Sequence, residues 1–375
     1  MRMVRNFIRK MFRGEHSSLN KIEVSKRALA ANLRAVSKAS KLAVAPVLKS
    51  NAYGHGLREV AKVFDSLHPP FLCVDSIYEG YELMKAGIRT PVLITGYVNP
   101  DNLRVKKLPF SYAVYDIQTL RGILKNQPHA GIHLFVDTGM HREGIPFPLF
   151  EDFLREMPRG ARIEGIMSHL AYGGAPDHPF TKRQIESFNE SVELLRGWGI
   201  DPPWKHVAAS SALLLAEKYG DRLGNLGRAG LSLYGISDKN GALFPALRFL
   251  TTLVQMKTVK KGDRVGYDFS FVAEQEMRIG VLPAGYNDGV DMRLFGKGIV
   301  LLRGVPCPIV GKVSMNVTVV DVTDVPEARI GDEVTIYSSE EGAKNSIREC
   351  AKACGAIPYE LLVHLHPSTK RVVVD

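Results

Sequence analysis

Short apolar segments recur along the chain between residues 42 and 231, and longer stretches with apolar residues at helical spacing, such as Thr181–Arg196, separate them. This alternation predicts parallel strands joined by crossover helices, and eight such units over about 225 residues fit a (β/α)8 barrel. A doubly wound sheet would fit the same periodicity. No G-x-G-x-x-G sequence follows the first strand, which weakens a dinucleotide-binding interpretation. The predicted strands are Leu42–Leu48, Phe71–Val74, Val92–Ile94, Tyr112–Val114, Ile132–Val136, Ile163–Met167, His206–Ala208 and Leu226–Leu231.

The pattern changes after about residue 245, where short apolar runs are separated by turns that contain glycine or proline. Only Ser346–Cys354 has helical spacing in this part. The fold class is therefore α/β, with an N-terminal extension at 1–19, a barrel at 20–245 and a mostly β domain at 246–375. The predicted strands of that domain are Leu250–Lys257, Arg278–Leu282, Gly298–Leu302, Pro308–Val310, Val317–Val322 and Glu333–Tyr337.

The first 13 residues place apolar side chains at helical spacing between basic ones, which predicts a short basic amphipathic helix. It lacks the continuous apolar core of a secretory signal. We expect this extension to pack on its own protein or to fray, because so short a helix is marginal alone. Contact with a membrane surface and a targeting role are the alternatives. We also expect it to be dispensable for catalysis.

Composition and charge exclude several classes of protein. The net charge is +10, but basic and aromatic residues are not interleaved as in a nucleic-acid platform, so no nucleic-acid partner is predicted. No apolar run approaches the roughly 20 residues of a transmembrane helix. Four cysteines are too few for a disulfide framework in a chain of 375 residues, which favours free thiols and a reducing, cytoplasmic location.

Polar residues follow the predicted barrel strands at their carboxyl ends, where barrel enzymes build their sites. Singly, each could be an ordinary surface or packing residue. Five such placements together predict one pocket: Lys49 after the first strand, Asp137–Arg142 after the fifth, Ser168-His169 after the sixth, Ser210-Ser211 after the seventh and Arg228-Gly230 at the eighth.

The stretch around Lys49, PVLKSNAYGHG, resembles the lysine motif of the alanine racemase family, which are fold type III enzymes dependent on pyridoxal 5'-phosphate (PLP). The resemblance extends from about residue 20 to the C-terminus, with further motifs in matching order. These are DTGMHR at 137–142, Ser168-His169, HVAAS at 206–210, RAGLSLYG at 228–235, VGY at 265–267, AGYNDG at 284–289, VSMN at 313–316 and IPYE at 357–360.

What the resemblance implies is a set of site residues. Lys49 would carry PLP covalently, Arg228 would meet its pyridine ring, and His169 would link that arginine to a catalytic tyrosine, Tyr267. The full cofactor set would be Lys49, Tyr53, His169, Ser210, Arg228, Tyr359 and the backbone of Gly230 and Leu231. The substrate-binding set would be Arg142, Tyr286 and Met315. No metal ligands are expected, and Asp137 is expected to be structural rather than a base.

The implied function is interconversion of L- and D-alanine by two bases, Lys49 and Tyr267, which would supply D-alanine for cell-wall peptidoglycan. Because the two bases lie in different predicted domains, the resemblance also implies a homodimer with shared active sites. The alternatives are a racemase of broader specificity or another fold III PLP enzyme. A decarboxylase of that fold should carry a CESxD-like motif in its second domain, and none is present.

Three positions depart from the family pattern. Many of its members have a carbamylated lysine two residues before the DTGM motif, and the charge of the carbamate orients the arginine that follows. Here that position is Phe135, the glycine before Arg142 is replaced by His141, and the aspartate after Met315 is replaced by Asn316. We therefore expect another group to hold Arg142, or looser orientation of it, and activity that does not depend on bicarbonate.

Overall fold

The computed structural model describes residues 18–236, 243–340 and 342–375. The first 17 residues, where the sequence predicts a basic helix, lie outside the described residues. The described chain divides into two compact units. The barrel unit consists of Glu23–Arg248, Ser338–Pro367 and Arg371–Asp375, and the β unit consists of residues 18–22, Phe249–Tyr337 and Ser368–Lys370.

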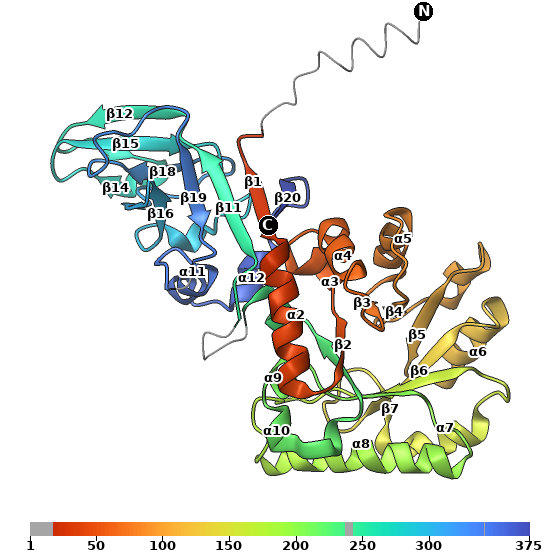
Figure 1. The fold of residues 1–375 in the computed structure, drawn as a ribbon. Coiled ribbons are helices and arrows are strands. Elements are labelled where there is room, and N and C mark those ends of the chain that lie inside the picture. The colour runs from red at the N-terminus through yellow and green to blue at the C-terminus, as the bar shows by residue number, and fades with distance from the viewer. Residues whose placement is uncertain (1–17, 237–242, 341) are drawn as a thin grey trace, which may run out of the picture. The chain divides into compact units, whose positions relative to one another are not determined.

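Each of the eight predicted barrel strands has a counterpart in the barrel unit, where Figure 1 labels β2 to β6, although β9 overlaps its predicted range, His206–Ala208, only at His206. Parallel pairing runs in the order β3-β4-β5-β6-β8-β9, and β10 pairs with β2. Single bridges from Val47 to Cys73 and from Ala209 to Arg228 close the ring, so the predicted (β/α)8 barrel is confirmed. The strands are β2 (Ala43–Pro46), β3 (Leu72–Val74), β4 (Val92–Ile94), β5 (Phe110–Val114), β6 (Gly131–Asp137), β8 (Ile163–Met167), β9 (Trp204–His206) and β10 (Leu226–Ala229), with a short β7 (Ile145–Pro146) beside β6.

Several helices of the barrel unit, among them α2, α5, α6 and α11, begin at a side-chain cap. The Ser25 hydroxyl accepts from the Ala28 amide at 3.0 Å, and Ser76 and Glu79 form a capping box. The helices are α2 (Lys26–Ser40), α3 (Lys49–Tyr53), α4 (Leu57–Asp65), α5 (Ile77–Lys85), α6 (Ile117–Asn126), α7 (Phe150–Glu156), α8 (Pro179–Gly197), α9 (Ser210–Leu214), α10 (Ala216–Tyr219), α11 (Ile347–Cys354) and α12 (Pro358–Val363). Single 3-10 turns are η1 (Pro100–Arg104), η2 (Phe147–Leu149), η3 (Gly220–Leu223) and η4 (Leu231–Tyr234).

Buried side chains fill the barrel interior in layers, as expected for this architecture. One cluster joins Ala45, Cys73, Leu93 and Leu226 with Phe71. A second cluster joins Ala113, Phe135 and Met167, from three consecutive strands of the sheet. The strands are therefore held by apolar packing on the inside, which leaves their carboxyl ends free to carry polar residues.

The β unit is built from short antiparallel strands. A six-stranded sheet has the order β17-β16-β19-β11-β1-β20, a three-stranded sheet has the order β12-β15-β18, and β13 pairs with β14. The strands of these sheets are β1 (Lys21–Ser25), β11 (Leu247–Thr252), β12 (Gln255–Val259), β13 (Arg264–Val265), β14 (Phe271–Val272), β15 (Met277–Leu282), β16 (Ile299–Leu302), β17 (Val305–Pro308), β18 (Thr318–Asp321), β19 (Glu333–Tyr337) and β20 (Lys370–Val374), with 3-10 turns η5 (Tyr267–Phe269) and η6 (Met292–Leu294). By their residues, β1, β11 and β20 belong partly to the barrel unit.

Two strand predictions in this part are wrong in detail because the chain changes partners. The predicted strand Leu250–Lys257 is two strands. The Leu253 amide donates to Asp332 and the Val254 amide to Val281, so the chain leaves one sheet and enters another. The predicted strand Pro308–Val310 lies in β17 only at its first residue, and Val310 turns to pair with Val319.

The compact units also differ from the predicted domain boundary at 245/246. Residues 338–367, which include α11 and α12, group with the barrel. Helix α12 was not expected from the sequence. Its Leu361 and Leu362 are buried, and the Arg348 guanidinium donates to the Gly235 carbonyl at 3.1 Å. Tyr359 is thereby part of the barrel unit.

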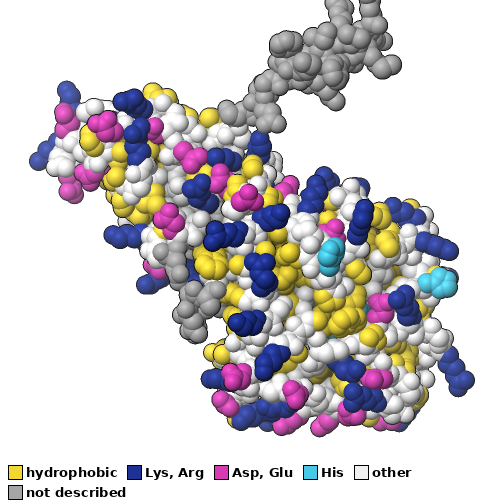
Figure 2. Space-filling view, in the orientation of Figure 1, with side chains coloured by type: hydrophobic (Ala, Val, Ile, Leu, Met, Phe, Trp, Pro, Cys, Tyr) yellow, Lys and Arg dark blue, Asp and Glu magenta, His cyan; other side chains and the backbone are white. Residues whose placement is uncertain are grey.

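The distribution of surface charge and the apolarity of the helices bear on two possible partners, nucleic acid and membrane. On the face shown in Figure 2, lysine and arginine side chains are scattered among acidic ones rather than gathered in a stripe. Of the helices within the described ranges, none combines the length and apolarity that a membrane crossing requires.

Candidate active site

A cavity of about 590 Å³ lies at the carboxyl ends of the barrel strands, within the roughly 300–1,000 Å³ typical of small-molecule sites. It is lined from the barrel unit alone, including α12. Nine of the twelve predicted site residues line it: Lys49, Tyr53, Arg142, His169, Ser210, Arg228, Gly230, Leu231 and Tyr359. The structure thus brings together residues that are up to 310 positions apart (359 − 49).

Lys49 enters the cavity three residues after β2 ends, at the start of an unusual turn. The backbone of Ser50, Asn51, Ala52 and Tyr53 has positive φ of 51–56°, so four consecutive non-glycine residues adopt the left-handed conformation. Neighbours hold this turn: the Glu79 carboxylate accepts from the Ser50 amide at 2.7 Å. Strained backbone of this kind is concentrated at functional sites, where the surrounding structure imposes it.

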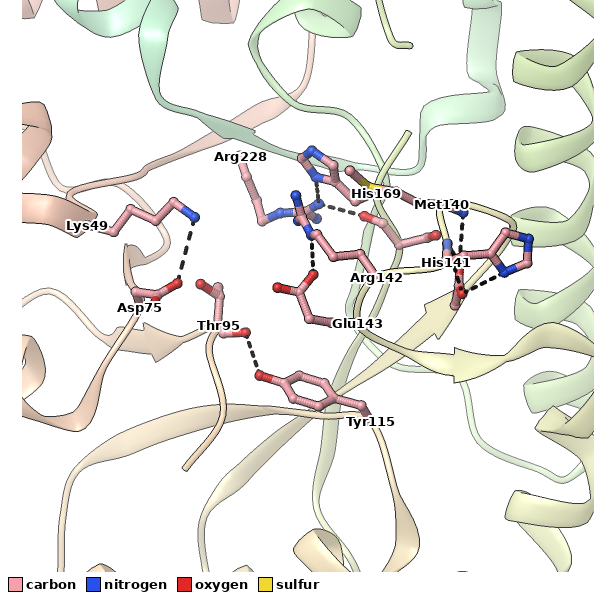
Figure 3. Close-up of polar contacts among 12 residues, drawn as sticks. Lys49, Asp75, Thr95, Tyr115, Met140, His141, Arg142, Glu143, His169 and Arg228 are labelled. Atoms are coloured by element: carbon pink, nitrogen blue, oxygen red, sulfur yellow. Dashed lines mark hydrogen bonds and ion pairs between the residues drawn. The ribbon is translucent and has the colours of Figure 1, made fainter. Parts of the chain in front are cut away.

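The amine of Lys49 lies 3.7 Å from the Asp75 carboxylate (Figure 3). Asp75 follows β3, and Thr95, which also lines the cavity, follows β4. The sequence analysis missed both residues. The rule that found Lys49, a polar residue at the carboxyl end of a barrel strand, would have found them too.

Hydroxyl and amide groups gather at one end of the cavity, around Ser210. Its Oγ accepts from the Gly230 amide at 3.1 Å and from the Ser232 amide at 3.2 Å. A Cβ at Gly230 would lie 2.6 Å from the Tyr53 hydroxyl, so only glycine lets that phenol approach the backbone. Burial, then the charge of Asp75, raise the pKa of Tyr53 to about 12, and the phenol remains a hydrogen-bond donor at neutral pH. This end of the cavity suits an anion with several acceptor oxygens.

Arg228 is buried, and its two terminal Nη groups are hydrogen-bonded. It donates to His206 Nδ1 at 2.8 Å, to the His206 carbonyl at 2.7 Å and to the Ser168 carbonyl at 2.6 Å. Burial lowers its pKa to about 10, which leaves the guanidinium charged at neutral pH. A guanidinium has no acceptor, so His206 Nδ1 carries no proton.

The contact between Arg228 and His206 determines the tautomers of two buried histidines, His206 and His133. Burial, then Arg228, lower the pKa of His206 far below its usual range, so the ring is neutral and its proton sits on Nε2. That Nε2 lies 2.8 Å from His133 Nδ1 and donates to it. The proton of His133, whose pKa burial lowers to about 3, is then on Nε2, 4.0 Å from the Glu164 carboxylate. This buried chain was not predicted from the sequence.

His169 contacts the same arginine, with its Nδ1 3.3 Å from an Arg228 Nη. Burial, followed by the charges of Arg228, Arg142 and Lys49, lowers the pKa of His169 to about 3. The neutral ring therefore accepts from Arg228 through Nδ1 and keeps a donor at Nε2. The predicted link between His169 and Arg228 is present.

The loop after β6 carries Arg142. The Asp137 carboxylate accepts from the Gly139 and Met140 amides, both at 2.9 Å, which confirms Asp137 as a structural residue. His141 has a φ of 55°, a left-handed conformation that its motif position usually gives to glycine, and its side chain is 86% exposed. Phe135 is buried in the apolar cluster beneath and offers no acidic group.

Of the two expectations for Arg142, another group that holds it or looser orientation, the structure shows the first. The Arg142 Nε donates to the Glu143 carboxylate, and both side chains line the cavity (Figure 3). With Asp75, two carboxylates therefore face this end of the cavity. Sequence reasoning missed Glu143 because a single acidic residue in a loop carries no pattern.

The remaining predicted residues, Tyr267, Tyr286 and Met315, lie on adjoining loops of the β unit. A Cβ at Gly285 would lie 2.1 Å from the Ser314 carbonyl, and one at Gly266 would lie 3.2 Å from the Lys312 amide. All three side chains are exposed: Tyr267 by 68%, Met315 by 57% and Tyr286 by 41%.

The fold and the site are those of a two-domain barrel protein with a polar small-molecule cavity at the carboxyl ends of its barrel strands. The family model described as "Alanine racemase, N-terminal domain" matches residues 24–238, and "Alanine racemase, C-terminal domain" matches residues 246–373. The chain belongs to the alanine racemase family.

Relatives and solved structures agree over nearly the full length. The chain is 35% identical to an alanine racemase of Sorangium cellulosum, covering 92% of this chain and 96% of that protein. It is 34% identical to alanine racemase 1 of Caldanaerobacter subterraneus, covering 94% of each. Among solved structures, alanine racemase from Streptomyces lavendulae has a TM-score of 0.85 at 27% identity, covering 96% of this chain and 98% of that one. The Bacillus anthracis enzyme with bound L-Ala-P has a TM-score of 0.86 at 27% identity, covering 96% of each.

Proposed function

We propose that this protein interconverts L-alanine and D-alanine with PLP as its cofactor. The observation that carries the proposal is that Lys49, Arg228 and a group of hydroxyl side chains line one cavity of suitable volume. The relatives' names point to the same substrate.

The residues present fit PLP. Ser210, Tyr53, Tyr359 and the Gly230 and Leu231 amides would hold its phosphate, and the absence of a Cβ at Gly230 provides the close approach that this needs. Lys49 would hold it covalently. When bound, PLP withdraws electrons from the amino-acid Cα and makes its proton removable.

Arg228 would face the pyridine nitrogen. As a charged donor without an acceptor, it can hydrogen-bond that nitrogen without passing it a proton at neutral pH, unlike a carboxylic acid. The contacts of Arg228 with His206 and Ser168 fix its position. This arrangement would limit charge withdrawal into the ring and suppress side reactions.

Two bases are needed, because racemisation takes a proton from one face of Cα and returns one to the other. The Lys49 amine would serve one face and the Tyr267 phenol the other, with His169 tuning the phenol. Arg142 would bind the substrate carboxylate, with Met315 and Tyr286 beside it.

We further propose that Tyr267 acts in the cavity of a second copy of the chain, so that a homodimer shares its active sites. The support is the exposure of Tyr267, Met315 and Tyr286 on adjoining loops of the β unit, since exposed apolar patches mark interfaces.

The test is the visible spectrum of the purified protein with assays on L- and D-alanine. Lys49→Ala should lose both the absorbance of the covalently held cofactor and racemisation. A coloured and fully active Lys49→Ala protein would end this proposal.

A further inference from the structure

Arg142 and Glu143 form an ion pair inside the cavity lining. The Nε of Arg142 donates to Oε2 of Glu143, and the two side chains are 52% and 42% exposed (Figure 3). Of the side chains that the structure describes, Glu143 is the one that hydrogen-bonds this arginine. Nothing in the racemisation chemistry itself requires Glu143.

The backbone beneath the pair is fixed, although the arginine side chain is long. Asp137 holds the Gly139 and Met140 amides at the start of the loop. At its end, Gly144 has a φ of 127° and packs so closely that a Cβ would lie 2.6 Å from the Asp137 amide. The Cα atoms of Arg142 and Glu143 therefore have a defined place, and what remains to be fixed is the direction of the guanidinium.

The floor below the pair is apolar. Phe135 is 6% exposed, and its ring packs edge-on against Tyr115 at 5.9 Å between centroids. The Tyr115 hydroxyl is directed to the Thr95 carbonyl at 3.0 Å, so it does not compete for Arg142. Burial, then the Glu143 charge, raises the pKa of Tyr115, so the phenol stays protonated at neutral pH and keeps donating to Thr95.

We propose that Glu143 is a positioning residue, whose carboxylate occupies the Nε edge of Arg142 and directs the two terminal Nη groups at the carboxylate of the amino-acid substrate. A guanidinium is a planar fork with five donors, so engaging one edge leaves the opposite end free for a second, bidentate carboxylate. The inference rests on the proposed function, because it takes the substrate's carboxylate as the ligand of Arg142.

A competing hypothesis predicts the opposite change in carboxylate binding when Glu143 is replaced. If Glu143 merely neutralised Arg142, removing its charge would strengthen the binding of a carboxylate. If it orients Arg142, removing it would weaken binding. The sign of the change therefore separates the two, independently of its size.

The experiment measures propionate binding to the holoenzyme by calorimetry, because propionate has the carboxylate of alanine without its amine. Glu143→Asp, Glu143→Gln and Glu143→Ala form the series. Glu151→Gln is the matched control, since Glu151 forms a similarly exposed ion pair with Arg155 on α7. Because the Arg142 pair is about half exposed, we expect a moderate effect, with propionate about threefold weaker for Glu143→Gln and about fivefold weaker for Glu143→Ala.

Steady-state kinetics supply a second readout. The KM for alanine should rise in the same order while kcat changes less, because a carboxylate contact is made in both the ground state and the transition state. Glu143→Asp should retain part of the affinity, and Glu151→Gln should match the unsubstituted protein.

Three results would overturn the inference: equal propionate affinity in Glu143→Ala and the unsubstituted protein, tighter binding in Glu143→Gln, or no propionate binding by the unsubstituted holoenzyme. The expected series of affinities in a protein that racemises no alanine would support the positioning role and count against the proposed function alone.

Discussion

Arg228 donates hydrogen bonds to both the ring nitrogen Nδ1 and the carbonyl oxygen of His206, at 2.8 and 2.7 Å. The second contact depends only on the backbone, whereas the first needs an unprotonated Nδ1. His206 thus acts on Arg228 through its side chain in one tautomer only, and His133 supports that tautomer by accepting from Nε2.

Two replacements of His206 should therefore separate the effect of its hydrogen-bond acceptor from the effect of its volume. In His206→Leu the buried guanidinium loses one acceptor, and we expect the free energy of unfolding to fall by about 3 kcal/mol. PLP affinity should fall as well, because Arg228 loses a restraint. His206→Gln keeps an acceptor and should retain part of both. Urea unfolding and absorbance titration with PLP measure the two effects, and a Leu variant as stable as the unsubstituted protein would contradict this account.

Shared active sites predict complementation between inactive subunits. Lys49→Ala and Tyr267→Phe should each abolish most racemisation. After subunit exchange, an equal mixture should recover about a quarter of the original activity, because half of the dimers are mixed and each of these has one intact site of two. A mixture of Lys49→Ala with the Lys49→Ala/Tyr267→Phe double variant is the control and should stay inactive. No recovery despite demonstrated exchange would argue against sharing.

Bicarbonate should not change the rate of racemisation. Phe135 occupies the position at which a carbamylated lysine stands in many family members, and its buried ring has no nitrogen to react. The measurement is the rate with L-alanine, D-alanine, serine and lysine in carbonate-depleted buffer, before and after adding bicarbonate. Strong activation on any substrate would show that a different group carries a carbamate.

Acidification should destabilise the protein below about pH 6.5. Burial lowers the pKa of His133 to about 3 and that of His55 to about 4, so the folded state keeps both neutral while the unfolded state protonates them. Their contribution is complete above pH 6.5 and is lost as the pH falls, by about 1.4 kcal/mol per pH unit for each. Urea midpoints between pH 7.5 and 4.5 measure the slope. His133→Asn should reduce it, and a slope unchanged by that replacement would contradict this account.

The barrel could be predicted because buried parallel strands leave a direct trace in the sequence. Segments such as Val92–Ile94 are continuous apolar runs, and Lys49 and Arg228 stand out at their ends. Helix α12 has six residues, too few for helical spacing to be recognised. Its grouping with the barrel unit depends on contacts between residues far apart in the chain.

Parts of the site escaped prediction for a different reason. The His206–His133 chain exists because two strands bring the rings within 2.8 Å, and neither histidine has a sequence neighbour that indicates this. Glu143 likewise can be recognised as a site residue only when the direction of the Arg142 side chain is known. Position along a strand is encoded locally, but the pairing of side chains across strands is not.

The left-handed turn after Lys49 limits how this site could be transplanted. Non-glycine residues in that conformation cost roughly 1–2 kcal/mol each, so the segment from Ser50 to Tyr53 opposes its own native form. It is held by contacts from distant parts of the barrel unit, including the Arg371 guanidinium on the Gly54 carbonyl at 2.9 Å. If PVLKSNAYGHG were grafted onto another barrel, the lysine would be present but not directed into the cavity in the same way. The conformation of the loop depends on contacts with the rest of the barrel unit.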